Sequence, residues 1–252
     1  MNIKVNELNY SYVNNPIFDS INLEFSKNKF HGILGPNGCG KTTLLKTILK
    51  LLKVNQDSIY INNEDILDIE RYSLAKKISY VEQNSTQLPH ISVRDYINLS
   101  RYLYNDYNKE PNETINNIIS LLKIEKLELK FIDELSGGEL QKVIIARALS
   151  QETKILILDE PTANLDPLHQ VEIMNLLSNL VEEKQITIIT TLHDINLALS
   201  YCDNVVLINK NQIIQGPTKE VINKTNIKNY FNLNSHFIKN PFTDKDYVIL
   251  NQ

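Results

Sequence analysis

The chain has 252 residues and a formal net charge of -4, so it lacks the overall positive field that draws proteins to DNA or RNA, and we expect no nucleic acid partner. Its two cysteines, Cys39 and Cys202, are too few for a disulfide framework and indicate a reducing compartment. No run approaches the roughly 18 apolar residues of a membrane span, and residues 1–6 do not resemble a signal peptide, so we expect any membrane association to need a partner.

Apolar and polar residues alternate over residues 3–5 and 21–25, which predicts two strands near the start of the chain. Tyr10 and Tyr12 lie in a predicted turn between them. A tyrosine ring beside a nucleotide could stack on the base, whereas a tyrosine at the end of a strand could equally cover the core. Position alone leaves both interpretations open.

A glycine-rich segment lies between a predicted buried strand, Phe30–Leu34, and a predicted helix, Leu44–Leu52. It is Gly35-Pro36-Asn37-Gly38-Cys39-Gly40-Lys41-Thr42-Thr43, the G-x-x-x-x-G-K-[ST] pattern of a phosphate-binding loop in its strand–loop–helix context. Bare glycines let successive N–H groups point at an anion, and the helix N-terminus adds partial positive charge. Lys41 is then placed for the β- and γ-phosphates and Thr42 for Mg²⁺. We therefore expect a nucleoside triphosphate here rather than an ordinary glycine turn.

Two more strands are predicted before the pattern becomes helical. Ser58–Asn63 predicts a strand that enters a turn, and Ile78–Val81 predicts a strand that ends shortly before Gln83. The amide oxygen of Gln83 could ligate Mg²⁺ or orient a water molecule, although a glutamine in this place is often only a surface residue.

Residues 86–150 have helical periodicity. The clearest apolar stripe, at helical spacing, consists of Ile115, Ile118, Ile119 and Leu122 in a segment that Pro111 opens. Helices inserted between strands predict a helical sub-domain set into an α/β core.

The last helix of this region is predicted to begin with a capping box, in which Ser136 is the N-cap and Glu139 stands three residues later. A cap alone does not explain the adjacent Gly137 and Gly138, which weaken a helical first turn by roughly 1 kcal/mol each. Because bare amides and a hydroxyl at a helix start suit an anion, we interpret this segment as a binding element.

Two acids follow the next apolar run, Ile155–Leu158, which predicts a buried strand. Open α/β sheets bind ligands at the carboxyl ends of their strands, so Asp159 could hold Mg²⁺ and Glu160 could act as the general base on an attacking water. Adjacent acids at a strand end are also common on surfaces, but the phosphate loop upstream favours function. Residues 163–166 then turn the chain into a helix that begins near Leu168.

The strand predicted at Gln185–Leu192 ends at His193. This histidine could stabilise charge beside the γ-phosphate and hold the catalytic glutamate in place. A lone histidine at a strand end is more often structural; its convergence with other strand ends favours the catalytic interpretation.

A hairpin is predicted between Val205–Ile208 and Gln212–Gln215. Its turn lacks the aspartate of the guanine-reading N-K-x-D motif, so GTP specificity gains no support. Residues 221–252 mix helical and extended patterns and carry no recognisable chemistry.

Together these motifs resemble the nucleotide-binding subunit of an ATP-binding-cassette (ABC) transporter over nearly the full length. In chain order they are Gly35–Thr43 (Walker A), Gln83 (Q-loop), Leu135–Gln141 (signature), Ile155–Glu160 (Walker B), Ala163–Asp166 (D-loop) and His193 (switch histidine). Tyr12 matches the position of the family's adenine-stacking aromatic better than Tyr10 does.

The resemblance implies an α/β fold: a P-loop NTPase (RecA-like) core with an antiparallel β sub-domain and an inserted α-helical sub-domain. A single ABC ATPase domain would span residues 1–252. Residues 1–85 and 151–252 would form the α/β core with the β sub-domain, and residues 86–150 the helical signature sub-domain.

The resemblance also implies an ATPase coupled to transmembrane transport that works as a head-to-tail homodimer. ATP would lie between the phosphate loop of one copy and Ser136-Gly137-Gly138-Glu139 of the other, with Tyr12 and Asp166 also contacting nucleotide. The implied catalytic residues are Glu160, His193, Gln83 and Lys41, and the implied Mg²⁺ ligands are Thr42, Gln83 and Asp159.

His193-Asp194-Ile195-Asn196-Leu197-Ala198 and Gly38-Cys39-Gly40 resemble the ATPases of iron–siderophore, haem and cobalamin importers. This implies integral membrane permease subunits and an extracellular substrate-binding protein as partners, with the chain at the cytoplasmic face of the cell membrane. The chain departs from the family at Asp57 and Asn63, where glycine is usual, although both residue types tolerate left-handed turns.

Three alternatives stay open. The ATPase of another small-solute importer, such as one for metal ions or phosphonates, would share the same chemistry. A soluble cassette ATPase of DNA repair or translation usually carries two cassettes or long basic or coiled-coil insertions, which this acidic chain with one set of motifs lacks. A non-hydrolysing module is disfavoured because Glu160, Gln83 and His193 are all present.

Overall fold

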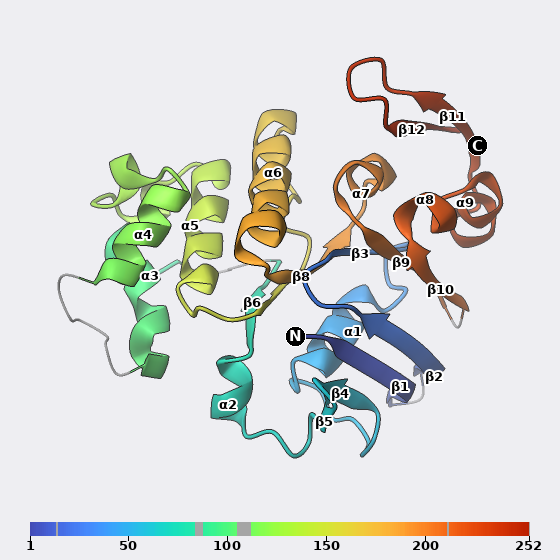
Figure 1. The fold of residues 1–252 in the computed structure, drawn as a ribbon, viewed down its shortest axis with the longest axis horizontal. Coiled ribbons are helices and arrows are strands. Elements are labelled where there is room, and N and C mark those ends of the chain that lie inside the picture. Colours follow the sequence, from blue (N-terminus) through green and yellow to red (C-terminus); the bar gives the residue numbers. More distant parts are fainter. Residues whose placement is uncertain (14, 84–87, 105–111, 211, 252) are drawn as a thin grey trace.

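A six-stranded sheet, a four-stranded sheet and a two-stranded hairpin organise the chain (Figure 1). The computed structural model describes all residues except 14, 84–87, 105–111, 211 and 252. Pro111, which was predicted to open a helical segment, and Asn211, in the turn of the hairpin predicted between Val205–Ile208 and Gln212–Gln215, lie outside the described residues.

The four-stranded sheet is antiparallel and has the order β2-β1-β4-β5. Its strands are β1 (Ile3–Tyr12), β2 (Asn15–Phe25), β4 (Ile59–Ile61) and β5 (Glu64–Asp65). The strands predicted at residues 3–5 and 21–25 are confirmed and are longer than the alternation alone indicated. Tyr10 and Tyr12 belong to β1, where they pair with β2, so their prediction as turn residues was wrong. Asp57 and Asn63 have φ angles of 62° and 66°, so they take the left-handed conformation that glycine would otherwise supply.

The six-stranded sheet has the order β10-β9-β3-β8-β7-β6. Its strands are β3 (Phe30–Leu34), β6 (Ile78–Val81), β7 (Ile155–Leu158), β8 (Thr187–Leu192), β9 (Asn204–Asn209) and β10 (Gln212–Pro217). All neighbouring pairs are parallel except β9 with β10, which form the predicted hairpin.

Both faces of this sheet are covered. Leu156 and Leu158 of β7 belong to one apolar core, and Ile155 and Ile157 belong to the other. The continuous apolar run of β7 follows from this, because a parallel strand between two layers has no solvent face. The carboxyl ends of β3, β6, β7 and β8 consequently share one edge.

Helix α1 (Lys41–Ile48) begins directly after the phosphate loop and ends before Leu52, so the predicted helix over Leu44–Leu52 is wrong at its end. The N–H of Leu51 donates to Lys46 O at 3.0 Å and that of Lys50 to Thr47 O at 3.1 Å. With Lys50 at a φ of 55°, these bonds form a Schellman cap, which stops the helix although the apolar pattern continues.

The described residues between β6 and β7 contain helices and no strand, as predicted. They form α3 (Val93–Asn98), α4 (Glu113–Leu121), α5 (Gly137–Leu149) and three 3₁₀ turns: η1 (Leu99–Tyr104), η2 (Glu125–Leu127) and η3 (Ile132–Glu134). The stripe of Ile115, Ile118, Ile119 and Leu122 is buried in the core shared by these helices. Figure 1 places α3, α4 and α5 together at one end of the molecule.

The remaining helices are α2 (Arg71–Ala75), α6 (Pro167–Lys184), α7 (Ile195–Tyr201), α8 (Thr218–Val221) and α9 (Lys224–Phe231). The C-terminal hairpin of β11 (Asn234–Lys239) and β12 (Asp246–Asn251) packs beside α7 and α9 (Figure 1). No helix in the described part of the chain has the length and apolar character to cross a membrane.

Helix α4 ends in the same way as α1, with Lys123 at a φ of 55° and the N–H of Ile124 donating to Ile119 O at 3.1 Å. Because glycine adopts this conformation without a Cβ clash, Lys123→Gly is expected to raise the free energy of unfolding by about 1 kcal/mol. Urea denaturation followed by circular dichroism measures the effect. The control Ser120→Gly, three residues earlier inside α4, should lower the free energy of unfolding by about 0.5 kcal/mol, because glycine is a weaker helix former than serine. Equal effects of the two changes would contradict the cap at Lys123.

Candidate active site

Two of the three glycines in the phosphate loop, Gly35 and Gly40, stand where a side chain would collide with a neighbour. A Cβ on Gly35 would lie 2.1 Å from Ile208 O, and a Cβ on Gly40 would lie 2.7 Å from Ile17 Cγ2. Gly38 and Gly40 also have φ angles of +75° and +108°, which L residues rarely adopt. No heavy atom of the described chain comes within 4 Å of a Cβ built on Gly38, so the loop backbone is open there to a phosphate.

Lys41 lies across this loop and is buried. Its Nζ donates hydrogen bonds to Gly35 O at 2.9 Å and to Pro36 O at 3.2 Å, which holds the ammonium group against the loop. The next residue, Thr42, is half-buried at the start of α1. A helix N-terminus, an ammonium group and the backbone of a glycine loop together fit the triphosphate of a nucleotide.

A cavity of about 490 Å³ opens over the loop, which is within the usual size for a small-molecule site. Its lining residues come from distant parts of the chain: Tyr12, Ile17, Asn37, Gly38, Gly40, Lys41, Thr42, Thr43, Gln83, Glu160 and His193. The remaining predicted loop residues, Gly35, Pro36 and Cys39, lie behind this surface. Burial raises the pKa of the Cys39 thiol, so it is protonated at neutral pH.

Three strand ends meet at Glu160. The His193 Nε2 lies 2.5 Å from Glu160 Oε1, and Gln83 Nε2 donates a hydrogen bond to Glu160 Oε2. Gln83 follows β6, Glu160 follows β7 and His193 follows β8, so the convergence expected at this edge is confirmed. The arrangement leaves the Glu160 carboxylate held from two sides and facing the cavity.

Thr191 joins the two acids of the site through hydrogen bonds, a link that the sequence analysis missed. Its Oγ1 accepts a hydrogen bond from Glu160 N at 2.7 Å and donates one to Asp159 Oδ1 at 2.7 Å. Glu160 has a φ of 51°, a conformation that costs a non-glycine residue roughly 1–2 kcal/mol, so the hydroxyl secures a strained position. The available signal was the presence of threonines, Thr187, Thr190 and Thr191, in a strand that is buried throughout.

Asp159 lies deeper than the other predicted site residues. It is only 1% exposed and is not among the residues that line the cavity. Hydroxyl, amide and carboxylate oxygens of Thr42, Gln83 and Asp159 are the donor types that Mg²⁺ prefers, so the residues present suit that ion. Within the described residues, no group of three or more His, Cys, Asp or Glu side chains is placed to hold a metal by itself.

Tyr12 lies at the rim of the cavity and is 44% exposed. It makes an edge-to-face contact with Tyr10, with ring centroids 5.0 Å apart, while Tyr10 packs against the core of the antiparallel sheet. Of the two tyrosines, Tyr12 is therefore the one placed to meet a nucleotide base.

The signature and the D-loop lie apart from this cavity. None of Ser136, Gly137, Gly138, Glu139 and Asp166 is among its lining residues in the described chain. The predicted capping box is confirmed, since Ser136 Oγ accepts from Glu139 N at 3.3 Å and Ser136 N donates to Glu139 Oε2 at 2.9 Å. Asp166 is the N-cap of α6.

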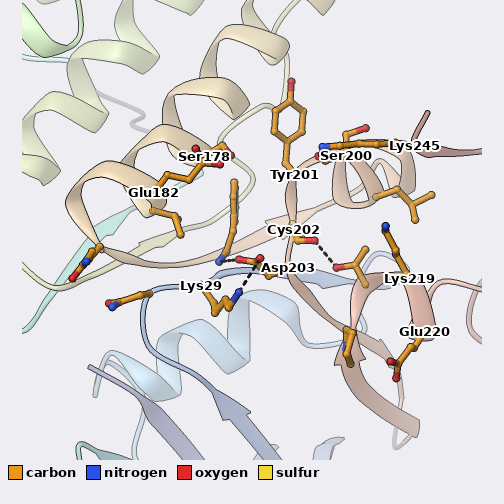
Figure 2. Close-up of a pocket in the computed structure, with 17 residues that line it drawn as sticks. Lys29, Ser178, Glu182, Ser200, Tyr201, Cys202, Asp203, Lys219, Glu220 and Lys245 are labelled. Atoms are coloured by element: carbon orange, nitrogen blue, oxygen red, sulfur yellow. Dashed lines mark hydrogen bonds and ion pairs between the residues drawn. The ribbon is translucent and has the colours of Figure 1, made fainter. Parts of the chain in front are cut away.

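A second cavity, of about 760 Å³, lies between α6, α7 and α8 (Figure 2). It reaches Phe30 at the start of β3, whereas the phosphate loop follows the end of that strand. Its charged lining residues balance, with Lys29, Lys219 and Lys245 against Glu182, Asp203 and Glu220. This lining has no preference for an anion such as a nucleotide.

A parallel sheet with a glycine loop between its strand β3 and helix α1 defines the class of P-loop NTPases. The ABC transporter family profile matches residues 18–163. The achromobactin transport ATP-binding protein CbrD of Dickeya dadantii is 34% identical, over 94% of this chain and 90% of the relative. The ferric enterobactin transport ATP-binding protein FepC of Escherichia coli is 32% identical, over 96% and 92%.

Among solved structures, cbiO1 from Clostridium perfringens, part of the ABC transporter complex cbiONQ, superposes with a TM-score of 0.78. It is 35% identical, and the match covers 91% of this chain and 94% of that one. The chain belongs to the ATP-binding subunits of ABC transporters and is an ATPase. The predicted α/β P-loop fold is thereby confirmed.

Replacing Thr191 tests its link to both acids. Thr191→Val keeps the shape but removes the hydroxyl, which leaves a carboxylate oxygen of the buried Asp159 and the N–H of Glu160 without this partner. We expect kcat for ATP hydrolysis to fall roughly tenfold to a hundredfold in a steady-state phosphate-release assay. Thr191→Ser should restore activity, and the matched change Thr190→Val in the same strand should retain it. Equal losses of kcat in the two valine variants would contradict the role assigned to the Thr191 hydroxyl.

Proposed function

We propose that this chain hydrolyses ATP to power an importer for an iron–siderophore, haem or cobalamin. The observation that carries the hydrolytic part is the convergence of Gln83 and His193 on Glu160 beside the phosphate loop. A carboxylate held between two neighbours at the edge of a phosphate site is placed to act on a water molecule.

In the proposed reaction, water attacks the γ-phosphorus of ATP and the bond to the β–γ bridging oxygen breaks. Glu160 takes the proton of the attacking water, and the His193 ring, hydrogen-bonded to Glu160, stabilises the charge that develops. Lys41 and the amides of Gly38 and Gly40 hold the phosphates. Thr42, Gln83 and Asp159 would hold Mg²⁺, which would supply positive charge to neutralise the phosphate oxygens.

Two copies complete the proposed site. In each copy, the phosphate loop, Glu160 and His193 line the nucleotide cavity. Ser136 and Gly137 are exposed and are not among its lining residues. A head-to-tail homodimer would bring the signature, Ser136–Glu139, and the D-loop aspartate Asp166 of one copy to the ATP of the other. The separation of these groups within one chain supports this arrangement.

The functions of the two relatives, CbrD and FepC, support an iron–siderophore as the transported substrate. One acts in achromobactin transport and the other in ferric enterobactin transport. We infer partners of three kinds: integral membrane permease subunits, a second copy of the chain, and an extracellular substrate-binding protein. The chain would act at the cytoplasmic face of the cell membrane, without nucleic acid.

We also propose the division of the domain that the motifs imply. Residues 1–85 and 151–252 would form the α/β core with its β sub-domain, and residues 86–150 the helical signature sub-domain. The packing of α3, α4 and α5 against one another at one end of the molecule supports this division (Figure 1).

Glu160→Gln tests the hydrolytic mechanism. The amide cannot accept the proton, so we expect ATP to bind while hydrolysis slows by about a hundredfold to ten-thousandfold. A dimer of this variant should then accumulate in the presence of ATP. Analytical ultracentrifugation with and without nucleotide measures it. The control Glu182→Gln changes an exposed glutamate on α6 far from the cavity and should behave as the unmodified chain. Unchanged turnover in Glu160→Gln would remove Glu160 from the role of base.

Co-purification tests the transport role. The tagged chain, isolated from detergent-solubilised native membranes, is expected to retain a polytopic permease that peptide sequencing identifies. Membranes with the untagged chain serve as the control. Recovery of soluble proteins or nucleic acid alone would instead support a soluble cassette ATPase and would leave the ATPase chemistry intact.

A further inference from the structure

The two adjacent glycines of the signature have different surroundings. Gly137 is exposed, and a Cβ built on it would meet Leu165 Cδ2 at an ordinary distance of 3.8 Å. Gly138 is buried, and a Cβ built on it would lie 2.2 Å from Cδ2 and 2.5 Å from Cγ of the His169 ring. The imidazole of His169 therefore occupies the space that any larger residue at position 138 would need.

The D-loop holds this ring in place. The backbone N–H of His169 donates to Asp166 Oδ1 at 2.9 Å, and the ring Nδ1 lies 2.8 Å from Asp166 Oδ2. These hydrogen bonds lower the pKa of Asp166, so the carboxylate stays ionised as the acceptor. One aspartate thus caps α6 and sets the orientation of the imidazole against Gly138.

Further contacts stabilise the region in which the signature and the D-loop meet. Gln170 Nε2 donates to Leu165 O at 3.1 Å, which fixes the loop residue that lies beside Gly137. One turn further along the helices, Lys142 of α5 pairs with Glu172 of α6 at 2.7 Å. The N-terminal parts of α5 and α6 are consequently joined by the His169 ring against Gly138 and by the Lys142–Glu172 ion pair, and the ring contact is the one within the signature.

We propose that His169 is a positioning residue that locks the signature, Ser136–Glu139, to the D-loop, Ala163–Asp166. The inference rests on the proposed head-to-tail dimer, in which both segments approach the ATP of the partner. Joined through the His169 ring, they are presented as one rigid unit. Without the ring, each segment would have to be ordered separately when the dimer forms, which weakens dimerisation but leaves ATP binding by one copy unchanged.

The test uses the full chain carrying Glu160→Gln, so that ATP-bound dimers persist. His169→Ala in this background is expected to weaken ATP-dependent dimerisation roughly tenfold, measured by analytical ultracentrifugation. ATP affinity of the monomer, measured by equilibrium binding at low protein concentration, should stay the same. His236→Ala on the exposed strand β11 is the matched control and should change neither quantity.

A double-mutant cycle tests the ring contact itself. Gly138→Ala should weaken dimerisation strongly when His169 is present, because the added methyl group displaces the ring. The same change should cost several-fold less in the His169→Ala background, where the space is free. An equal cost in both backgrounds would overturn the contact as the reason for glycine at this position.

The remaining outcomes distinguish the proposed head-to-tail dimer from the proposed role of His169. A Glu160→Gln parent that stays monomeric with ATP would overturn the proposed dimer, and this inference with it. A parent that dimerises, together with a His169→Ala form that dimerises equally well, would overturn only the role of His169. Parallel losses of monomer ATP affinity and of dimerisation in His169→Ala would show a general structural role and would also overturn it.

Discussion

The parallel pairing of β3, β8, β7 and β6 is the constraint on which the rest of the molecule depends. These strands are covered on both faces, so their apolar residues are buried, and the charged carboxylates Asp159 and Glu160 follow the end of β7. Because the strands run in the same direction, everything that follows them lies at one edge. The phosphate loop, Gln83, Glu160 and His193 are neighbours for that reason, although up to 158 positions separate them along the chain (35 to 193).

The carboxylates of Asp159 and Glu160 lie close together at this partly buried edge of the sheet, and hydrogen bonds stabilise them there. Asp159 is 1% exposed, and an unpaired carboxylate at such a depth would cost several kcal/mol. The Thr191 hydroxyl supplies a donor to it and accepts the N–H of Glu160, whose left-handed backbone turns the carboxylate toward the cavity. The strain at Glu160 is thus tied to the position that its side chain needs for the reaction.

The chain has only 7 glycines, and other residues adopt conformations that glycine commonly supplies. Lys50, Lys123, Asp57 and Asn63 all take left-handed conformations at positions where glycine is the common choice, because nothing there obstructs a side chain. At Gly35 and Gly138, in contrast, a Cβ would collide with Ile208 O and with the His169 ring. Conformation alone therefore does not explain every glycine of this chain, because at these two positions the close approach of another group requires it.

The sequence by itself determined the local elements: the phosphate loop, the capping box at Ser136 and the buried strands with their terminal polar residues. These depend on contacts within a few residues or on hydrophobic period, so their patterns are visible in one dimension. The end of α1 was missed because a backbone cap at Lys50 overrides an apolar pattern that continues past it. Only the tertiary structure decided that Thr191 holds Asp159 and Glu160, and that His169 lies on Gly138. Both contacts join residues that are 31 or 32 positions apart (191 against 159 and 160, 169 against 138), and no local pattern specifies which side chains the packing of β7, β8, α5 and α6 brings together.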